Sequence, residues 1–127
     1  MTTAIHLFDL VSRHNRWLSV RQSTIASNIA NANTPGYKAV DVEPFEKVLE
    51  TTSLSMQATQ PGHIADPTGR TADVNVRDSE PWEVSHSGNS VSLEQELMNA
   101  GEVNRSYRLN TSVAKAFHRM LLASAKV

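Results

Sequence analysis

The chain has 127 residues, of which 39% are apolar and 20% are charged, and its formal net charge is -1. This length and composition predict one soluble domain, and the near-neutral charge argues against a surface that binds a nucleic-acid backbone. The absence of cysteine excludes disulfides and thiolate chemistry. No run is apolar and long enough to span a bilayer, and the N-terminal residues lack the pattern of a cleaved signal peptide, which by itself favours the cytoplasm.

Residues 1–33 have the apolar spacing of one long helix. The apolar residues that recur three, four or seven positions apart are Ala4, Phe8, Val11, Leu18, Ile25, Ile29 and Ala32. Asn15 and Gln22 interrupt this heptad stripe, and Trp17 lies off it. A helix of about 42 Å has more apolar surface than one partner helix can cover. We therefore expect Phe8, Trp17, Leu18 and Phe117 to be covered by neighbouring copies of the chain.

The helix is expected to end near Asn31 or Asn33, because asparagine suits a helix C-terminus better than a helix interior. Pro35 moves Thr34 out of the α region, and Gly36 accepts the positive φ that a type II turn needs after proline. The sequence therefore predicts a tight turn from Thr34 to Tyr37.

The middle segment, 34–91, is expected to be mainly irregular. Val40 and Val42 alternate with acidic residues as in a short strand, residues 44–49 suit one or two helical turns, and residues 72–76 are a second strand candidate. Trp82 stands alone in this polar segment. Its indole either packs back onto the helices or faces a partner.

The last part, 92–127, is again helical, with Ser92 and Gln95 placed as a capping box. Its expected inward stripe is heptad-spaced and is widened by Val103, Phe117 and Leu122. The stripe consists of Leu93, Leu97, Ala100, Asn104, Tyr107, Thr111, Ala114, His118 and Leu121. The fold class is thus all-α: an antiparallel, coiled-coil-like hairpin of two terminal helices around an irregular centre that has room for a short β-hairpin.

No pattern of catalytic or ligand-binding residues is present. The five histidines have no metal-ligand spacing, and Glu94 and Glu96 point to different faces of a helix. No serine lies in a nucleophile motif, and no glycine loop could hold a phosphate. We expect no enzyme activity, no metal, no cofactor and no small-molecule substrate.

Two stretches carry a family resemblance. Ser27 to Tyr37, and more loosely Lys38 and Ala39, resemble the N-terminal signature of the bacterial flagellar axial proteins, the rod and hook family. Gly88 to Glu96 is similar to the segment that opens the C-terminal helix of proximal rod proteins in that family. The resemblance implies a structural subunit of the basal-body rod that polymerises helically and transmits torque. It also implies export through the flagellar type III apparatus without a cleaved signal peptide, and a final place in the periplasmic part of the basal body.

The partners implied are further copies of the chain, the rod-base adaptor and the MS ring, other rod proteins, and the export apparatus. The candidate assembly residues are Asn28, Asn31, Asn33, Thr34, Pro35, Gly36, Tyr37, Phe8, Trp17, Leu18, Ile25, Leu93, Leu97, Tyr107, Phe117 and Leu121. Two alternatives stay open: a different rod protein of the same family, and a cytoplasmic helical export chaperone or adaptor.

Overall fold

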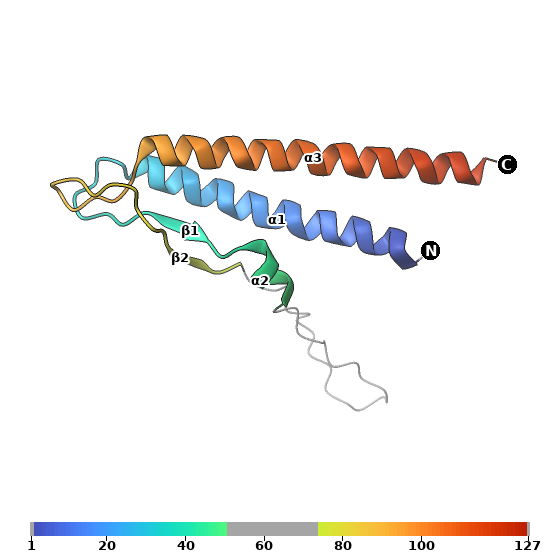
Figure 1. Cartoon of the computed structure of the whole chain (residues 1–127), viewed down its shortest axis with the longest axis horizontal. Coiled ribbons are helices and arrows are strands. Elements are labelled where there is room, and N and C mark those ends of the chain that lie inside the picture. Colours follow the sequence, from blue (N-terminus) through green and yellow to red (C-terminus); the bar gives the residue numbers. More distant parts are fainter. Residues whose placement is uncertain (1, 51–73, 127) are drawn as a thin grey trace, which may run out of the picture.

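The computed structural model of the chain describes residues 2–50 and 74–126, with side chains from His6 onward. Its elements are α1 (Thr2–Ala30), β1 (Val40–Val42), α2 (Phe45–Glu50), β2 (Val76–Asp78) and α3 (Leu93–Ala125). Helices α1 and α3 lie side by side and antiparallel, with both chain ends at the same end of the hairpin (Figure 1). Strand β1 packs on α1, so that α1 lies between α3 and the small sheet.

The two strands form an antiparallel pair in which Val40 lies opposite Asp78, Asp41 opposite Arg77 and Val42 opposite Val76. The strand expected at Val40–Val42 and the short helix expected after it are both confirmed. The second strand lies later than predicted, at Val76–Asp78, and residues 72 and 73 fall outside the described part of the chain. The all-α prediction therefore holds for the two long helices, and the middle segment, where the sequence leaves room for a short β-hairpin, contains a two-stranded sheet.

The apolar core is small and lies along the middle of α1. It contains Trp17, Leu18 and Ile25 from α1, Val42 and Val48 from the middle segment, and Val103 from α3. The expectation that Trp17 and Leu18 lack cover within the chain is wrong, because both are buried. The middle segment folds back onto α1, where Trp17 Nε1 donates a hydrogen bond to the Glu43 carbonyl at 2.7 Å and its ring meets that of Phe45.

The stripe of α3 that faces α1 differs from the predicted one by one residue. Leu93, Leu97, Tyr107 and Leu121 are exposed, with Leu97 67% accessible. The residues that face α1 are Glu96 and Val103, which are buried, Asn110, which bonds to His14 and Asn15, and Phe117, whose ring meets Phe8 edge-on. These four are also seven apart. Because two of them are polar, an apolar pattern could not reveal this face.

The start of α3 also differs from the capping box that was predicted. Ser92 is the N-cap residue, but its hydroxyl bonds to the Glu94 carboxylate and caps no backbone N–H. Gln95 donates to the Glu80 carbonyl at 3.4 Å instead of reaching back to Ser92. The side chain of Gln95 thus ties the segment before α3 to the first turn of the helix.

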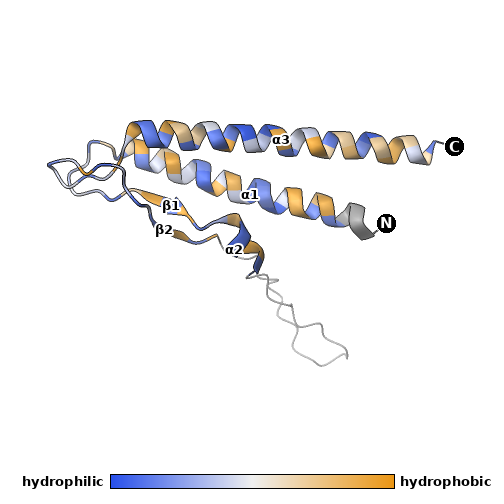
Figure 2. Ribbon diagram, viewed as in Figure 1, coloured by the Kyte–Doolittle hydropathy of each residue, from blue (hydrophilic) through white to orange (hydrophobic). Residues whose placement is uncertain are grey.

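Hydrophobic and hydrophilic residues are mixed along both long helices (Figure 2). Within residues 2–50 and 74–126, no helix is both long and apolar enough to cross a membrane. On α1, Leu18 and Ile25 of the predicted stripe are buried, while Phe8 and Ile29 are partly open to solvent. The core thus uses only part of the apolar surface that the helices carry.

We expect Leu18→Ala to lower the free energy of unfolding by about 2–4 kcal/mol, because it leaves a cavity in the core. The same truncation at the exposed Leu97 should change it by less than about 0.5 kcal/mol. Urea unfolding of the two purified variants, followed by far-UV circular dichroism, measures both values. Equal losses would show that Leu97 is packed as closely as Leu18 and would contradict its exposed position on α3.

Candidate functional site

Five polar residues, Asn28, Tyr37, Asn89, Ser90 and Glu96, gather where the end of α1 meets the start of α3. We call them the polar cluster. Asn28 is 1% exposed and lies at its centre. Its amide nitrogen donates to the Val40 carbonyl at 2.7 Å and to Glu96 Oε1 at 3.0 Å. Its amide oxygen accepts from the Val40 N–H at 3.1 Å and from the Tyr37 hydroxyl at 3.4 Å.

These four bonds use the full hydrogen-bonding capacity of an asparagine amide, which has two donors and two acceptor positions. They connect α1 to β1 and to α3, across 12 and 68 residues of sequence. At this position a carboxylate could accept hydrogen bonds but not donate them, and an aliphatic side chain could neither donate nor accept them. Asn28 therefore fixes three elements relative to one another.

The tight turn predicted over Thr34 to Tyr37 is confirmed. The Tyr37 N–H donates to the Thr34 carbonyl at 3.2 Å, and Gly36 has φ +73°. Helix α1 ends at Ala30, close to the predicted end, and the Asn31 amide donates to the Ser27 carbonyl of the last helical turn. No non-glycine residue in the described ranges has positive φ, so the asparagines act here through their side chains.

The turn packs against the segment that leads into α3. The Gly36 N–H donates to the Ser87 carbonyl at 2.9 Å, and the Ser90 N–H donates to the Tyr37 carbonyl at 3.0 Å. Gly88 has φ +83°, and a Cβ placed on it would lie 3.5 Å from the Gly36 Cα. That is an ordinary van der Waals distance, so the positive φ of Gly36 and Gly88, and not lack of space, is what favours glycine at these two positions.

Asn89, which is distant in the sequence, binds backbone carbonyls where α1 ends. Its amide nitrogen lies 2.9 Å, 3.0 Å and 2.7 Å from the carbonyl oxygens of Asn31, Ala32 and Thr34. These carbonyls follow the end of α1 at Ala30. Those of Asn31 and Thr34 also accept from the N–H groups of Thr34 and Tyr37, whereas the hydrogen bond of the Ala32 carbonyl in the described residues comes from Asn89. The Asn89 amide oxygen accepts from the Val91 N–H at 2.8 Å, which holds the side chain in place.

Ser90 and Glu96 complete the polar cluster. The Ser90 hydroxyl accepts from the Ala39 N–H at 2.8 Å. Glu96 is buried, with one carboxylate oxygen bonded to Asn28 and the other, Oε2, without a hydrogen-bond partner in the part of the chain that the structure describes. Burial raises the pKa of Glu96 above its ordinary value; the bond from Asn28 lowers it, Asp41 raises it and Arg21 lowers it.

Arg21 of α1 lies at the edge of this region and contacts three side chains. Its guanidinium is 3.3 Å from the Asp41 carboxylate, 3.2 Å from the Glu102 carboxylate, and 5.4 Å from the centre of the Trp17 ring. It therefore links α1 with β1 and α3 above the buried core. Sequence reasoning named neither Arg21 nor Asn89, Ser90 and Glu96 as site residues.

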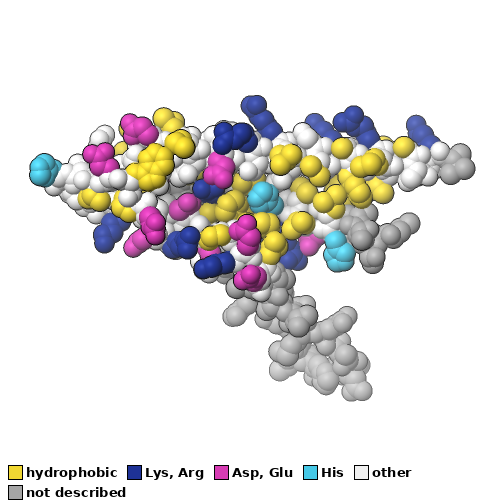
Figure 3. Space-filling model, viewed as in Figure 1, with side chains coloured by type: hydrophobic (Ala, Val, Ile, Leu, Met, Phe, Trp, Pro, Cys, Tyr) yellow, Lys and Arg dark blue, Asp and Glu magenta, His cyan; other side chains and the backbone are white. Residues whose placement is uncertain are grey.

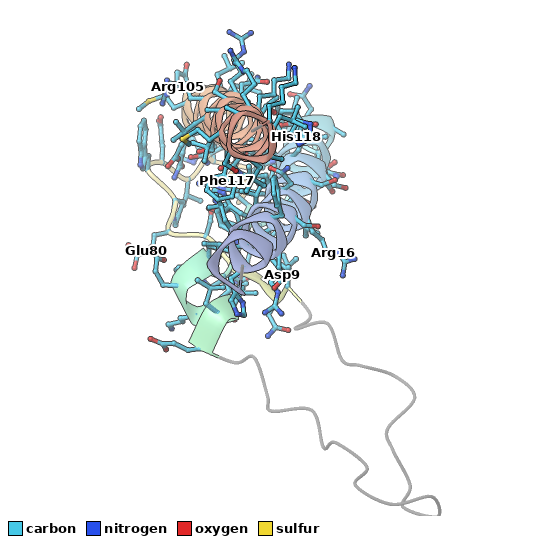
Figure 4. All side chains as sticks on the ribbon, turned by 90° about the vertical axis from the view of Figure 1, so that its right-hand side faces the viewer. Asp9, Arg16, Glu80, Arg105, Phe117 and His118 are labelled. Atoms are coloured by element: carbon cyan, nitrogen blue, oxygen red, sulfur yellow. The ribbon has the colours of Figure 1, made fainter. Side chains whose placement is uncertain are left out.

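The candidate residues fall into three groups in the structure. Asn28, Asn31, Thr34, Gly36 and Tyr37 lie in or next to the polar cluster, with Pro35 and Asn33 exposed beside them. Trp17, Leu18 and Ile25 are core residues. Phe8 and Phe117 meet at the opposite end of the hairpin, with ring centres 5.7 Å apart, where Figure 4 shows Phe117 between the helices. Leu93, Leu97, Tyr107 and Leu121 are exposed on α3.

A groove of about 430 Å³ runs between α1 and α3. Its walls are small and polar side chains with a few apolar ones: Asn15, Leu18, Ser19, Gln22, Ser23, Ala26, Val103, Asn104 and Tyr107. Within the described ranges, no three histidine or acidic side chains come together in a way that could hold a metal ion. In these ranges the arrangement offers packing surface and hydrogen bonds between the elements.

We expect Asn89→Ala to lower the free energy of unfolding by about 1–3 kcal/mol, because it leaves the Ala32 carbonyl without a donor and the Val91 N–H without an acceptor. Asn33→Ala removes an exposed amide from the same loop and should cost less than about 0.5 kcal/mol. Urea unfolding of the two variants provides the comparison. A similar small loss for both would show that water replaces the Asn89 amide.

Glu96 should make stability depend on pH. A carboxyl whose pKa is raised in the folded state contributes its stability fully below the ordinary value of 4.5, and that stability is lost as the pH rises through the raised value. Glu96→Gln keeps an acceptor for Asn28 and cannot ionise. Its melting temperature relative to the parent protein should therefore increase as the pH rises above 4.5.

Scanning calorimetry across this pH range measures the difference, and Glu94→Gln, an exposed site two residues away, is the control. A difference between Glu96→Gln and the parent protein that stays constant with pH would contradict the raised pKa.

Comparison with known proteins connects this geometry to a family. Residues 17–38, which include Asn28 and the turn, match the family model described as flagella basal body rod protein. The chain is 46% identical over 127 residues to the flagellar basal body rod protein FlgB of Agrobacterium fabrum, an alignment that covers 96% of this chain and 94% of the relative. It is 32% identical over 101 residues to FlgB of Yersinia enterocolitica, covering 73% of this chain and 74% of the relative. With FlgB of Escherichia coli it shares 31% identity over 102 residues, covering 72% of each. The chain therefore belongs to the FlgB family of flagellar basal body rod proteins.

Proposed function

We propose that this basal-body rod subunit polymerises helically through α1 and α3 to form the proximal part of the rod, and transmits torque as part of the driveshaft. The observation that carries this proposal is the apolar surface left open on α3. Its exposed large apolar residues are Leu93, Leu97, Met98, Tyr107, Leu109, Val113, Met120, Leu121 and Leu122. A single helix with this much exposed apolar surface is expected to be buried against other protein chains.

The exposed residues lie on more than one side of α3. At 100° per residue, Leu93, Leu97 and Leu122 lie on one side of the inward face, and Met98, Leu109 and Met120 lie on the other. One neighbouring helix cannot cover both sides. The groove between α1 and α3, with the small side chains Ser19, Ser23 and Ala26 on its wall, gives a further neighbour room for close approach. This arrangement supports a polymer in which each subunit has several neighbours, including coiled-coil-like contacts between helices.

We further propose distinct roles for the candidate residues. Phe8, Leu93, Leu97, Tyr107 and Leu121 contact neighbouring subunits directly, as does the exposed part of the turn at Thr34–Gly36. The buried residues, such as Leu18 and Asn28, act by holding the two helices in the geometry that assembly requires. Tyr37 does both, because its side chain is half-buried and its hydroxyl reaches Asn28.

The proposed partners are other FlgB copies, the rod-base adaptor that meets the MS ring, FlgC and other rod proteins, and the type III export apparatus that delivers the chain to the periplasmic rod without cleavage of a signal peptide. The similarity to FlgB proteins over most of the chain favours this assignment over FlgC. It likewise favours a rod subunit over an export chaperone. We propose no catalytic activity and no small-molecule substrate or nucleic-acid partner.

The test is the location of the chain in the cell. Deletion of its gene should abolish rod assembly and motility, and the full-length chain expressed in its place should restore both and co-purify with basal bodies. Immunoblotting of purified basal bodies and electron microscopy provide the measurement. A chain that remained in the soluble fraction with an export cargo would be a chaperone.

A further inference from the structure

Charges of opposite sign are separated along the second half of the chain. Between residues 78 and 104 there are six carboxylates and no lysine or arginine: Asp78, Glu80, Glu83, Glu94, Glu96 and Glu102. Between residues 105 and 126 there are five cations and no carboxylate: Arg105, Arg108, Lys115, Arg119 and Lys126. Figure 3 shows basic side chains along the outer edge of α3 and acidic side chains at the loop end, where a basic side chain also lies.

The acidic end also carries exposed apolar side chains. Trp82 is 62% exposed, and Val84 is exposed beside it in the sequence. The bond from Gln95 to the Glu80 carbonyl holds this segment against the first turn of α3. Trp82 and Val84 are thus exposed apolar side chains next to Glu80 and Glu83 in the sequence, and we call these four residues the acidic patch. Of the two sequence-based interpretations of Trp82, the structure supports the indole that faces outward.

The distal half of α3 carries the opposite combination. Leu109, Val113 and Met120 are exposed, and their spacing of four and seven residues places them along one strip of the helix. Arg108 and Arg119 lie directly before Leu109 and Met120 in the sequence and on the adjoining strip. We call these five residues the basic patch. Figure 4 shows the neighbouring Arg105 on the side of α3 away from α1.

The two patches cannot meet within one chain. From Gln95, whose side chain binds the Glu80 carbonyl, the helix rises about 20 Å to Arg108, the first residue of the basic patch, and about 36 Å to Arg119. No ion pair in the described ranges involves Arg105, Arg108, Lys115, Arg119 or Lys126, while Glu102, nearer the loop end, is paired with Arg21. The two patches have opposite charge, and each has an apolar centre, so they suit each other. They can meet only when they belong to different copies of the chain.

We propose that the acidic patch of one subunit docks on the basic patch of a second copy of this chain. The contact is heterologous, because the two surfaces differ, and repetition of such a contact continues as a helix when the rotation does not close. Charged borders select this orientation, since two acidic or two basic patches repel each other. The inference rests on the proposed function, for which it names the partner and the surface.

The chain has no cysteine, so introduced cysteines can test this contact directly. Two tagged copies are co-expressed, one with Trp82→Cys and the other with Leu109→Cys, Val113→Cys or Met120→Cys. After mild oxidation, basal bodies are purified and analysed on non-reducing gels, and the same mixtures are oxidised as concentrated purified protein. Ser12→Cys, an exposed site on α1, replaces the α3 cysteine in the control.

We expect a disulfide-linked dimer for at least one α3 position and none for Ser12→Cys. Adding Glu80→Lys and Glu83→Lys to the Trp82→Cys copy should lower the yield several-fold. Adding Arg108→Glu and Arg119→Glu to the other copy should restore it, because the charges are then exchanged rather than lost.

The inference fails if no dimer forms in basal bodies or in solution, or if charge reversal leaves the yield unchanged. It also fails if the basic patch instead binds phosphatidylglycerol vesicles and loses that binding with Arg108→Glu and Arg119→Glu while no dimer forms. A chain that is present in rods of normal length without the cross-link contradicts the docking alone. Absence of the chain from basal bodies contradicts the proposed function. In that case the cross-linked dimer in solution tests the docking: its presence supports the contact and its absence overturns it.

Discussion

The buried amide of Asn28 is the constraint on which the hairpin geometry depends. Its four hydrogen bonds join α1 to β1, to the turn and to Glu96 of α3, and all of them lie away from solvent or nearly so. Buried polar groups are costly unless every donor and acceptor is satisfied, so this position tolerates only one arrangement of the surrounding segments. An apolar core of six buried side chains could stabilise two helices in several registers. The amide selects one of them.

The two stretches that carry the family resemblance form one structural unit. Gly36 and Tyr37 of the first stretch bond to Ser87 and Ser90, and Asn89 of the second caps the helix that the first stretch ends. The turn could be predicted from sequence because Pro35 and Gly36 act on their own backbone. The role of Asn89 could not, because its partners lie 55 to 58 residues away and nothing local in the sequence marks them.

The face of α3 was mispredicted for a related reason. Periodicity assumes that inward residues are apolar, but Glu96 and Asn110 face α1 because Asn28, Asn15 and His14 supply their partners. On α1 the same reasoning located Leu18 and Ile25 correctly, since both are apolar and buried. The same reasoning predicted that Trp17 has no cover within the chain, because the sequence pattern of the middle segment does not indicate that α2 folds back onto α1. Long helices follow from local spacing, whereas the contacts between them depend on polar pairs that are distant in sequence.

The proposed assembly couples folding of the subunit to formation of the rod through the apolar surface. The described part of the chain buries seven apolar residues, whereas α3 alone exposes nine large ones. At roughly 25 cal/mol per Å² of apolar surface removed from water, burial between subunits can contribute stabilisation comparable to that of the core itself. The monomer also retains an unfavourable contribution, because the buried carboxyl of Glu96 has one oxygen without a hydrogen-bond partner in the described residues. In the proposed assembly through α1 and α3, the polar cluster fixes the geometry of the two helices, so that each added subunit presents the same surfaces to the next.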